Sequence, residues 1–225
     1  MRHILVTNAK GGCGKSTIAT SLAAYFASEG YATALADYDP QASALSWLEQ
    51  RPADYAPIAA VRAFESGLTH VPRNTEFLVI DSPAGSFGKD LSELVRKAET
   101  IIVPVLPSPI DIKAADRFID ELLGIAKVAD KKAKAALVAN RVKENTLIFE
   151  ELDDALSRLK VPYLTSFREA QNYIRAYQRG LGIHELPDGD ARNRRGSARA
   201  HAQGPIRTRT STLYRELRRD RPERR

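Results

Sequence analysis

The sequence contains a single cysteine, Cys13, and has no long apolar run. One cysteine excludes an intrachain disulfide framework and a multi-cysteine metal site. No apolar run approaches the ~20 residues that a membrane-spanning helix needs. Residues 1–6 enter a predicted strand almost at once, which leaves no room for a signal peptide. These absences favour a cytoplasmic protein without a membrane partner.

Positive charge is concentrated at the carboxyl end of the chain. The 225 residues have a net charge of +6, yet residues 188–225 alone hold twelve arginines against five acidic residues, a net of +7. Residues 1–187 therefore carry a net charge of about −1. An arginine-rich end favours an acidic polymer or surface as a partner. A solvated tail that only aids solubility explains the same composition equally well.

Short apolar runs alternate with helical spacing along the chain. This pattern predicts a doubly wound, mostly parallel α/β sheet with helices on both faces. With 43% apolar and 28% charged residues, the chain suits one such domain, which we place at residues 1–187. Residues 188–209, rich in Arg, Gly and Asp, predict a mobile insertion. Residues 210–225 predict a short helix and a basic tail, because Leu213 and Leu217 lie one turn apart.

The bounds of the individual helices and strands are predicted from the spacing of apolar residues and from residues, such as glycine, that end a helix. Gly30, for example, follows an apolar stripe of helical spacing and is expected to end that helix. Strands are expected at residues 4–7, 32–36, 57–61, 77–80, 101–105, 135–139 and 162–164, and helices at 15–29, 42–50, 109–128, 145–159 and 168–180.

The glycine-rich segment Gly-Gly-Cys-Gly-Lys-Ser at residues 11–16 follows a predicted strand and opens a predicted helix. That context is typical of a phosphate-binding loop, in which backbone N–H groups and a helix amino terminus face the phosphates. Lys15 is expected at the β- and γ-phosphates, the Ser16 hydroxyl on Mg²⁺, and Thr17 near the α-phosphate. Two later predicted strands end in Asp37 and Asp81, where a metal would need a carboxylate, so a chance glycine turn is disfavoured.

A second lysine, Lys10, precedes this loop, and the whole segment resembles the deviant Walker A motif, K-G-G-x-x-G-K-[ST], of the ParA/MinD family of ATPases. Further segments resemble motifs of the same family: D-Y-D-P-Q at 37–41, F-L-V-I-D-S-P at 77–83, P-V-L-P-S-P-I-D at 104–111, N-R at 140–141 and G-L-G-I-H-E at 180–185. The resemblance runs from Arg2 to about Leu186, and again weakly over Leu213–Leu217. It implies a P-loop fold and ATP hydrolysis with Mg²⁺.

The resemblance also implies a role for each matching residue. Lys10 would reach across an ATP-dependent homodimer to the partner's nucleotide. Asp39 would orient the attacking water. Asp81 would hold Mg²⁺ through water, and Asp37 would lie near the metal, with a loop cap as an equal alternative. The remaining nucleotide contacts would come from Gly11, Gly12, Cys13, Gly14, Asn140 and Arg141, with the Asn140 amide facing adenine.

The family has several branches, and the sequence narrows the choice among them. The apolar stripe in the tail is too thin for stable membrane insertion. The cysteine sets of iron–sulfur and metalloid members are missing. The remaining branch comprises positioning ATPases that bind DNA nonspecifically and are released by an adaptor, ParB-like or McdB-like, that stimulates hydrolysis. Candidate DNA contacts, each equally readable as a solvated charge, are Arg168, Arg175, Arg179, Arg215, Arg218 and Arg219.

The sequence does not identify the cargo. The candidates are a carboxysome, a plasmid or a protein cluster positioned over the nucleoid. A second class of function is an ATP-dependent small-molecule ligase of the same fold, similar to dethiobiotin synthetase. Such ligases normally lack the Lys10 equivalent and the D-x-D-P-Q run. A scaffold that binds ATP without hydrolysing it is disfavoured by the presence of Lys10, Lys15, Asp39 and Asp81.

Overall fold

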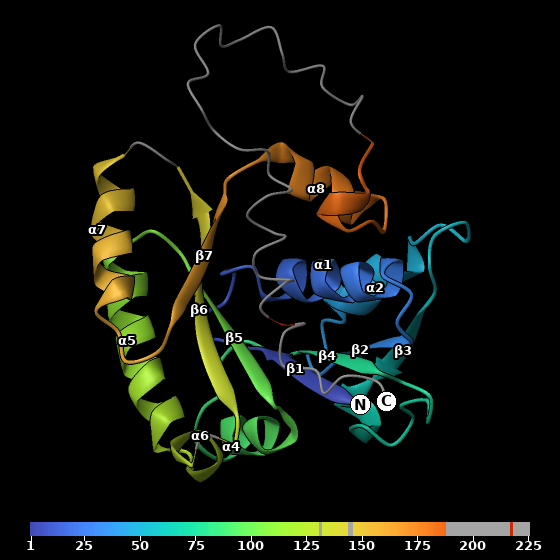
Figure 1. The fold of residues 1–225 in the computed structure, drawn as a ribbon, viewed down its shortest axis with the longest axis horizontal. Coiled ribbons are helices and arrows are strands. Elements are labelled where there is room, and N and C mark those ends of the chain that lie inside the picture. Colours follow the sequence, from blue (N-terminus) through green and yellow to red (C-terminus); the bar gives the residue numbers. More distant parts are fainter. Residues whose placement is uncertain (131, 144–145, 188–216, 218–225) are drawn as a thin grey trace, which may run out of the picture.

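A computed structural model of the protein describes residues 1–130, 132–143, 146–187 and 217 (Figure 1). A sheet of seven strands in the order β3-β2-β4-β1-β5-β6-β7 runs through it, and every neighbouring pair is parallel. The predicted doubly wound α/β fold is thereby confirmed. The strands are β1 (Arg2–Val6), β2 (Thr33–Asp37), β3 (Ile58–Arg62), β4 (Phe77–Asp81), β5 (Thr100–Val105), β6 (Lys134–Val142) and β7 (Tyr163–Arg168).

Helices cover both faces of this sheet. The helices are α1 (Lys15–Ser28), α2 (Ser43–Glu49), α3 (Ala63–Ser66), α4 (Gly88–Lys97), α5 (Pro109–Gly124), α6 (Ala126–Ala129), α7 (Leu147–Ser157) and α8 (Gln171–Gln178), followed by the 3₁₀ turn η1 (Ile183–Glu185). Helices α1, α2 and α8 lie together on one side of the sheet, and α4, α5 and α7 on the other (Figure 1). All parallel strands end at one edge, so the loops that follow them share that edge.

Apolar side chains point alternately to the two faces of the sheet, so each face has its own apolar core. In β4, Leu78 and Ile80 pack in the core under α4, α5 and α7, whereas Phe77 and Val79 pack in the core under α1 and α2. Successive side chains of a strand point to opposite faces, so a central parallel strand must be apolar throughout. β2, β4 and β5 are buried along their full length, which fixes their register and the position of the residues that follow them.

The predicted elements differ from the structure at several points, and the short helix α3 was not predicted. The helix predicted at 109–128 is divided into α5 and α6, because Ile125 has an extended backbone with φ −78° and ψ 124°. Arg168 ends strand β7 instead of beginning a helix. Helix α4 follows β4 where the sequence indicated no element, since its glycine-rich start obscures the apolar spacing of Leu91, Leu94 and Val95.

The carboxyl-terminal segment is described at one residue, Leu217. Its side chain is only 5% exposed and belongs to the core under α1, and its carbonyl accepts a hydrogen bond from Arg2 Nη1 at 2.9 Å. Leu213 and the predicted divisions at 188–209 and 210–225 otherwise lie outside the described residues and stay predictions. Within the described part of the chain, no helix is long and apolar enough to cross a membrane.

Candidate nucleotide site

The phosphate loop leaves the carboxyl end of β1, in the middle of the sheet, and α1 begins at its last residues. Gly12 and Gly14 have left-handed φ values of 73° and 95°, and a methyl group at Gly14 would overlap the amide of Asn140. Position 14 therefore requires glycine for two reasons: the left-handed backbone conformation and the close approach of the Asn140 amide. Cys13 is buried, and burial raises the pKa of its thiol, which keeps it a neutral filler rather than a nucleophile.

The two lysines of the loop have opposite environments. Lys15 is 7% exposed, and its Nζ donates to the Lys10 carbonyl at 2.9 Å, so its charge lies inside the loop where phosphates bind in P-loop proteins. The Lys10 side chain is 43% exposed, and its Nζ lies 3.7 Å from Asp111 Oδ1 at the start of α5. Ser108 caps α5 and contacts the Asp111 carboxylate. One lysine is thus placed for the chain's own site, and the other faces outward.

Asn8 fixes the position from which Lys10 projects. Its Oδ1 accepts from the Lys10 N–H at 3.0 Å, and its Nδ2 donates to the Pro104 carbonyl of β5 at 2.7 Å. Asn8 is 3% exposed, so both contacts are shielded from water. The sequence motifs did not indicate Asn8 as a site residue, because its second partner lies in a distant strand.

Asp37 is a cap for the amino terminus of α2. Its Oδ2 accepts from the backbone N–H groups of Ala44 at 2.9 Å and Leu45 at 3.3 Å, and its Oδ1 accepts from the Asp39 N–H at 2.9 Å. These are the contacts expected if Asp37 caps the loop. A direct metal role for Asp37 stays a prediction. Asp39 is half-buried, and its Oδ1 accepts from the Gln41 N–H at 2.9 Å, which leaves its other oxygen for a further partner.

Asp81 is the fully buried carboxylate next to these residues. It pairs in register with Asp37 of β2 and Val6 of β1. Neither of its oxygens has a hydrogen-bond partner among the described residues, although the nearby Ser16 hydroxyl favours the ionised form. Burial, with a smaller contribution from Asp37, raises the pKa of Asp81 to about 7. A buried carboxylate without a partner, beside the hydroxyl of the P-loop serine, fits Mg²⁺ held partly through water.

The described residues contain no cluster of three or more His, Cys, Asp or Glu side chains placed as a metal centre. Mg²⁺ commonly takes only one or two protein ligands and keeps several waters and phosphate oxygens, so Ser16 and Asp81 would suffice.

Asn140 lies at the end of β6, against the phosphate loop. Its Nδ2 donates to the Cys13 carbonyl at 2.8 Å, and its Oδ1 accepts from the Arg141 N–H at 3.0 Å. These contacts brace the loop, and recognition of adenine by Asn140 stays a prediction. Arg141 is exposed and has a left-handed φ of 53°, which is uncommon for a residue other than glycine and typical of functional sites.

The predicted DNA contacts are only partly described. Arg168 is exposed at the end of β7, on the edge of the sheet that carries the phosphate loop. Arg175 and Arg179 belong to α8 and its carboxyl end, and each has an interaction within the chain. Arg215, Arg218 and Arg219 lie outside the described residues. A common DNA-binding surface of the six arginines therefore stays a prediction.

Replacing Asp81 with asparagine is expected to stabilise the nucleotide-free protein at about pH 8, while weakening its use of Mg²⁺. Because the pKa of Asp81 is raised from 3.8 to about 7, the folded chain holds a proton across that interval that the unfolded chain has lost. Wild-type stability therefore falls as pH rises through this window, by on the order of 4 kcal/mol, and asparagine has no such loss. Thermal unfolding measured at several pH values without Mg²⁺ tests this.

The gain from Asp81→Asn should shrink toward about pH 4, where the folded wild-type carboxyl keeps its proton and no charge is buried. Asp54→Asn, an exposed substitution on the loop before β3, is the matched control and should show no pH-dependent gain. Equal effects of Asp81→Asn at both ends of the pH range would contradict the assignment of a raised pKa.

Comparison with known proteins agrees with this geometry. The family described as CobQ/CobB/MinD/ParA nucleotide binding domain matches residues 4–183. The chain belongs to this family. It is a ParA/MinD-type nucleotide-binding ATPase, and the predicted family and enzyme class are confirmed. Over 190 residues it is 32% identical to the maintenance of carboxysome distribution protein A of Halothiobacillus neapolitanus, which covers 81% of this chain and 87% of that protein.

Solved structures of this ParA/MinD class share the fold. An ATP complex of Cyanothece McdA has a TM-score of 0.65 at 14% identity and covers 82% of this chain and 90% of that one. A plasmid partition protein of Borrelia burgdorferi bound to AMPPNP has a TM-score of 0.69 at 17% identity and covers 96% of this chain and 98% of that one. At such identities the likeness establishes the common fold alone.

Proposed function

We propose that this ATPase forms an ATP-dependent homodimer, binds DNA nonspecifically and positions carboxysomes over the nucleoid in the cytoplasm. The observation that carries the proposal is the exposed Lys10 beside a complete phosphate loop, in a chain 32% identical to a carboxysome distribution protein. A plasmid or another protein assembly is the alternative cargo. A small-molecule ligase is the less favoured class, because Lys10 and the D-x-D-P-Q segment have no place in it.

Each residue of the site has one task in this scheme. The loop N–H groups and Lys15 bind the phosphates of ATP, and Ser16 and Asp81 hold Mg²⁺, which neutralises charge on the β- and γ-phosphates when bound. Asp39 orients the attacking water with the oxygen that Gln41 leaves free. Charge that develops on the transferring phosphoryl group is stabilised by positioned cations.

Lys10 supplies the cation that couples hydrolysis to dimerisation. In this chain its Nζ lies beside Asp111 rather than inside the loop. An ion pair with a side chain that is 43% exposed is worth little, so Lys10 can exchange Asp111 for the phosphates of a second subunit. Binding of ATP by one chain then creates the target for Lys10 of the other, and an adaptor that stabilises the productive arrangement would accelerate hydrolysis and release.

Binding of DNA should require the dimer and the arginine-rich segment. A monomer presents few cations, whereas a dimer doubles the phosphate contacts, and each contact releases counterions. Affinity for random duplex DNA should therefore rise with ATP and Mg²⁺ and fall steeply with salt. Fluorescence anisotropy measures both quantities. No binding at low salt by a protein shown to dimerise would refute the DNA part of the proposal.

The buried Leu217 determines how the arginine segment should be tested. Deletion of residues 188–225 would remove a core residue together with the charges. Glutamine substitution of four arginines, Arg192, Arg194, Arg195 and Arg199, removes charge and leaves Leu217 in place. We expect weaker DNA binding and a shallower salt slope, with ATP affinity unchanged. Lysine at the same four positions is the matched control and should bind like wild type; equal binding by the glutamine variant would mean that the tail only solubilises.

A further inference from the structure

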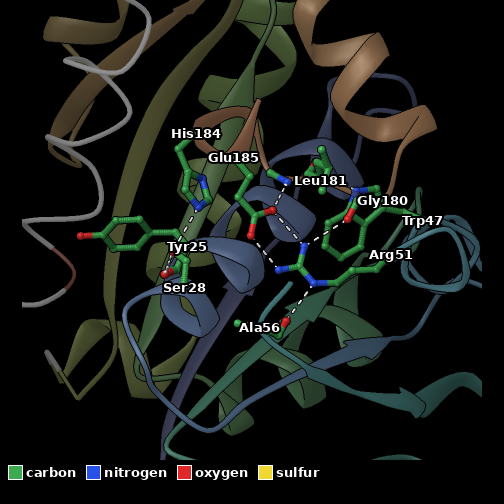
Figure 2. A network of polar contacts seen from close by, with 10 residues as sticks. Tyr25, Ser28, Trp47, Arg51, Ala56, Gly180, Leu181, His184 and Glu185 are labelled. Atoms are coloured by element: carbon green, nitrogen blue, oxygen red, sulfur yellow. Dashed lines mark hydrogen bonds and ion pairs between the residues drawn. The ribbon is translucent and has the colours of Figure 1, made fainter. Parts of the chain in front are cut away.

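Helix α8 and the turn that follows it form a strap, residues 171–186, along α2. Near the start of α2, the Tyr177 hydroxyl donates to the Ser43 carbonyl at 2.6 Å. Further along, Trp47 Nε1 donates to the Leu181 carbonyl at 3.2 Å (Figure 2). At the end of α2, a methyl group at Gly180 would overlap the backbone of Arg51, so the strap touches the chain directly. The strap therefore contacts α2 at its start, its middle and its end.

A buried ion pair fixes the far end of the strap. Arg51 and Glu185 are joined by two hydrogen bonds of 2.7 and 2.9 Å, and their side chains are 4% and 5% exposed (Figure 2). Arg51 also donates to the carbonyls of Ala56 and Gly180, and Glu185 also accepts from the Gly182 N–H. Such a bidentate pair with its other bonding groups satisfied is geometrically specific. The strap is thus held at one fixed point just after α2, which ends at Glu49.

The near end of α2 belongs to the catalytic segment. The Asp37 carboxylate accepts from the N–H groups of Ala44 and Leu45, both in the first turn of α2, which begins at Ser43. Between Asp39 and this turn lies Ala42, with a left-handed φ of 52°. A residue other than glycine in that region is strained and persists only where surrounding contacts hold it. The Tyr177 bond to Ser43 is one of the contacts that hold this turn.

Tyr177 is also close to the carboxylates of the site. Burial raises the pKa of its hydroxyl, and Asp81 and Asp37 raise it further. The hydroxyl therefore keeps its proton and remains a donor to Ser43 at neutral pH.

We propose that Tyr177 is a positioning residue for ATP hydrolysis: through the Ser43 carbonyl its hydroxyl holds the first turn of α2, and with it Asp37 and Asp39, in the productive position. The proposal rests on the role given to Asp39 in the proposed function.

The test is Tyr177→Phe, which removes one hydroxyl and keeps the ring. We expect kcat for ATP hydrolysis to fall about fivefold, the value of one net hydrogen bond, with KM for ATP changed by less than about twofold. The loop that binds the phosphates is not part of the contact, so ATP affinity should persist. Hydrogen exchange at the amides of Ala44 and Leu45 should be faster in the variant, as a direct readout of the turn.

Two control variants separate positioning from general support. Tyr163→Phe, at the start of β7 on the opposite edge of the sheet, removes a hydroxyl far from the site and should keep kcat. Glu185→Gln loosens the far end of the strap while the Tyr177 bond remains, and should also keep kcat within about twofold. An unchanged kcat in Tyr177→Phe, or an equal loss in Glu185→Gln, would overturn the proposal. Full activity in Asp39→Ala would instead overturn the proposed function.

Discussion

Replacing Lys15 with glutamine is expected to weaken ATP binding by about 100-fold or more, because charge-assisted bonds to two phosphates are lost. Lys15 is buried and its Nζ donates to the Lys10 carbonyl, so its charge lies inside the loop where the phosphates are expected. Glutamine can keep the bond to that carbonyl, and removal of a buried charge should leave the fold intact. Isothermal titration calorimetry with ATP and Mg²⁺ measures the change in Kd.

The matched control for Lys15→Gln is Lys10→Gln in the same loop. The exposed Lys10 is assigned to the partner's nucleotide, so a monomer with glutamine there should bind ATP as well as wild type does. Micromolar affinity retained in Lys15→Gln would refute the assignment of the loop. A matching loss in Lys10→Gln would place both lysines on the same nucleotide and remove the argument for a dimer.

Asp39→Ala is expected to slow ATP hydrolysis by about 100-fold or more while ATP binding and dimerisation persist. Only the placement of water is lost, so the ATP dimer should accumulate, and analytical ultracentrifugation with ATP should detect it. A variant that hydrolyses slowly should also stay longer on DNA. An Asp39→Ala protein that remains monomeric with ATP would contradict the scheme.

Asp39 has a structural contact that this experiment must control. Its Oδ1 accepts from the Gln41 N–H, and alanine removes that turn together with the carboxylate. Asparagine keeps an oxygen for Gln41 and loses only the charge. If Asp39→Asn is as slow as Asp39→Ala, the carboxylate itself is required. Restored hydrolysis in Asp39→Asn would assign the defect of the alanine variant to the turn.

The parts of the site predicted from sequence are those whose chemistry is local. One turn and the first residues of one helix position Gly14, Lys15 and Ser16. Their spacing along the chain is therefore sufficient to predict the phosphate loop. The buried strands were equally clear, because a parallel strand under two layers of helix is apolar at every position. Strand ends then placed Asp37 and Asp81 at one edge of the sheet.

The contacts missed from sequence join residues far apart in the chain. Tyr177 and Ser43 are 134 positions apart, and Lys10 meets Asp111 only because β1 and β5 are neighbours in the sheet. The periodicity of apolar residues does not predict contacts between residues so far apart in the chain. For Asp37, sequence allowed a cap and a metal role equally, since both place an aspartate at a strand end, and only the bonds to Ala44 and Leu45 distinguish a cap.

Leu186 and Leu217 are both buried, at 8% and 5% exposure, so the chain between them is a closed loop attached to the domain at each end. Whatever conformation these residues adopt, covalent geometry limits the midpoint of the loop to roughly 50 Å from either attachment, about 15 residues at full extension. The arginines of this segment therefore cannot lie farther than this from the domain. A ligand bound by these arginines would therefore stay within that distance of the domain, at a high effective concentration near it.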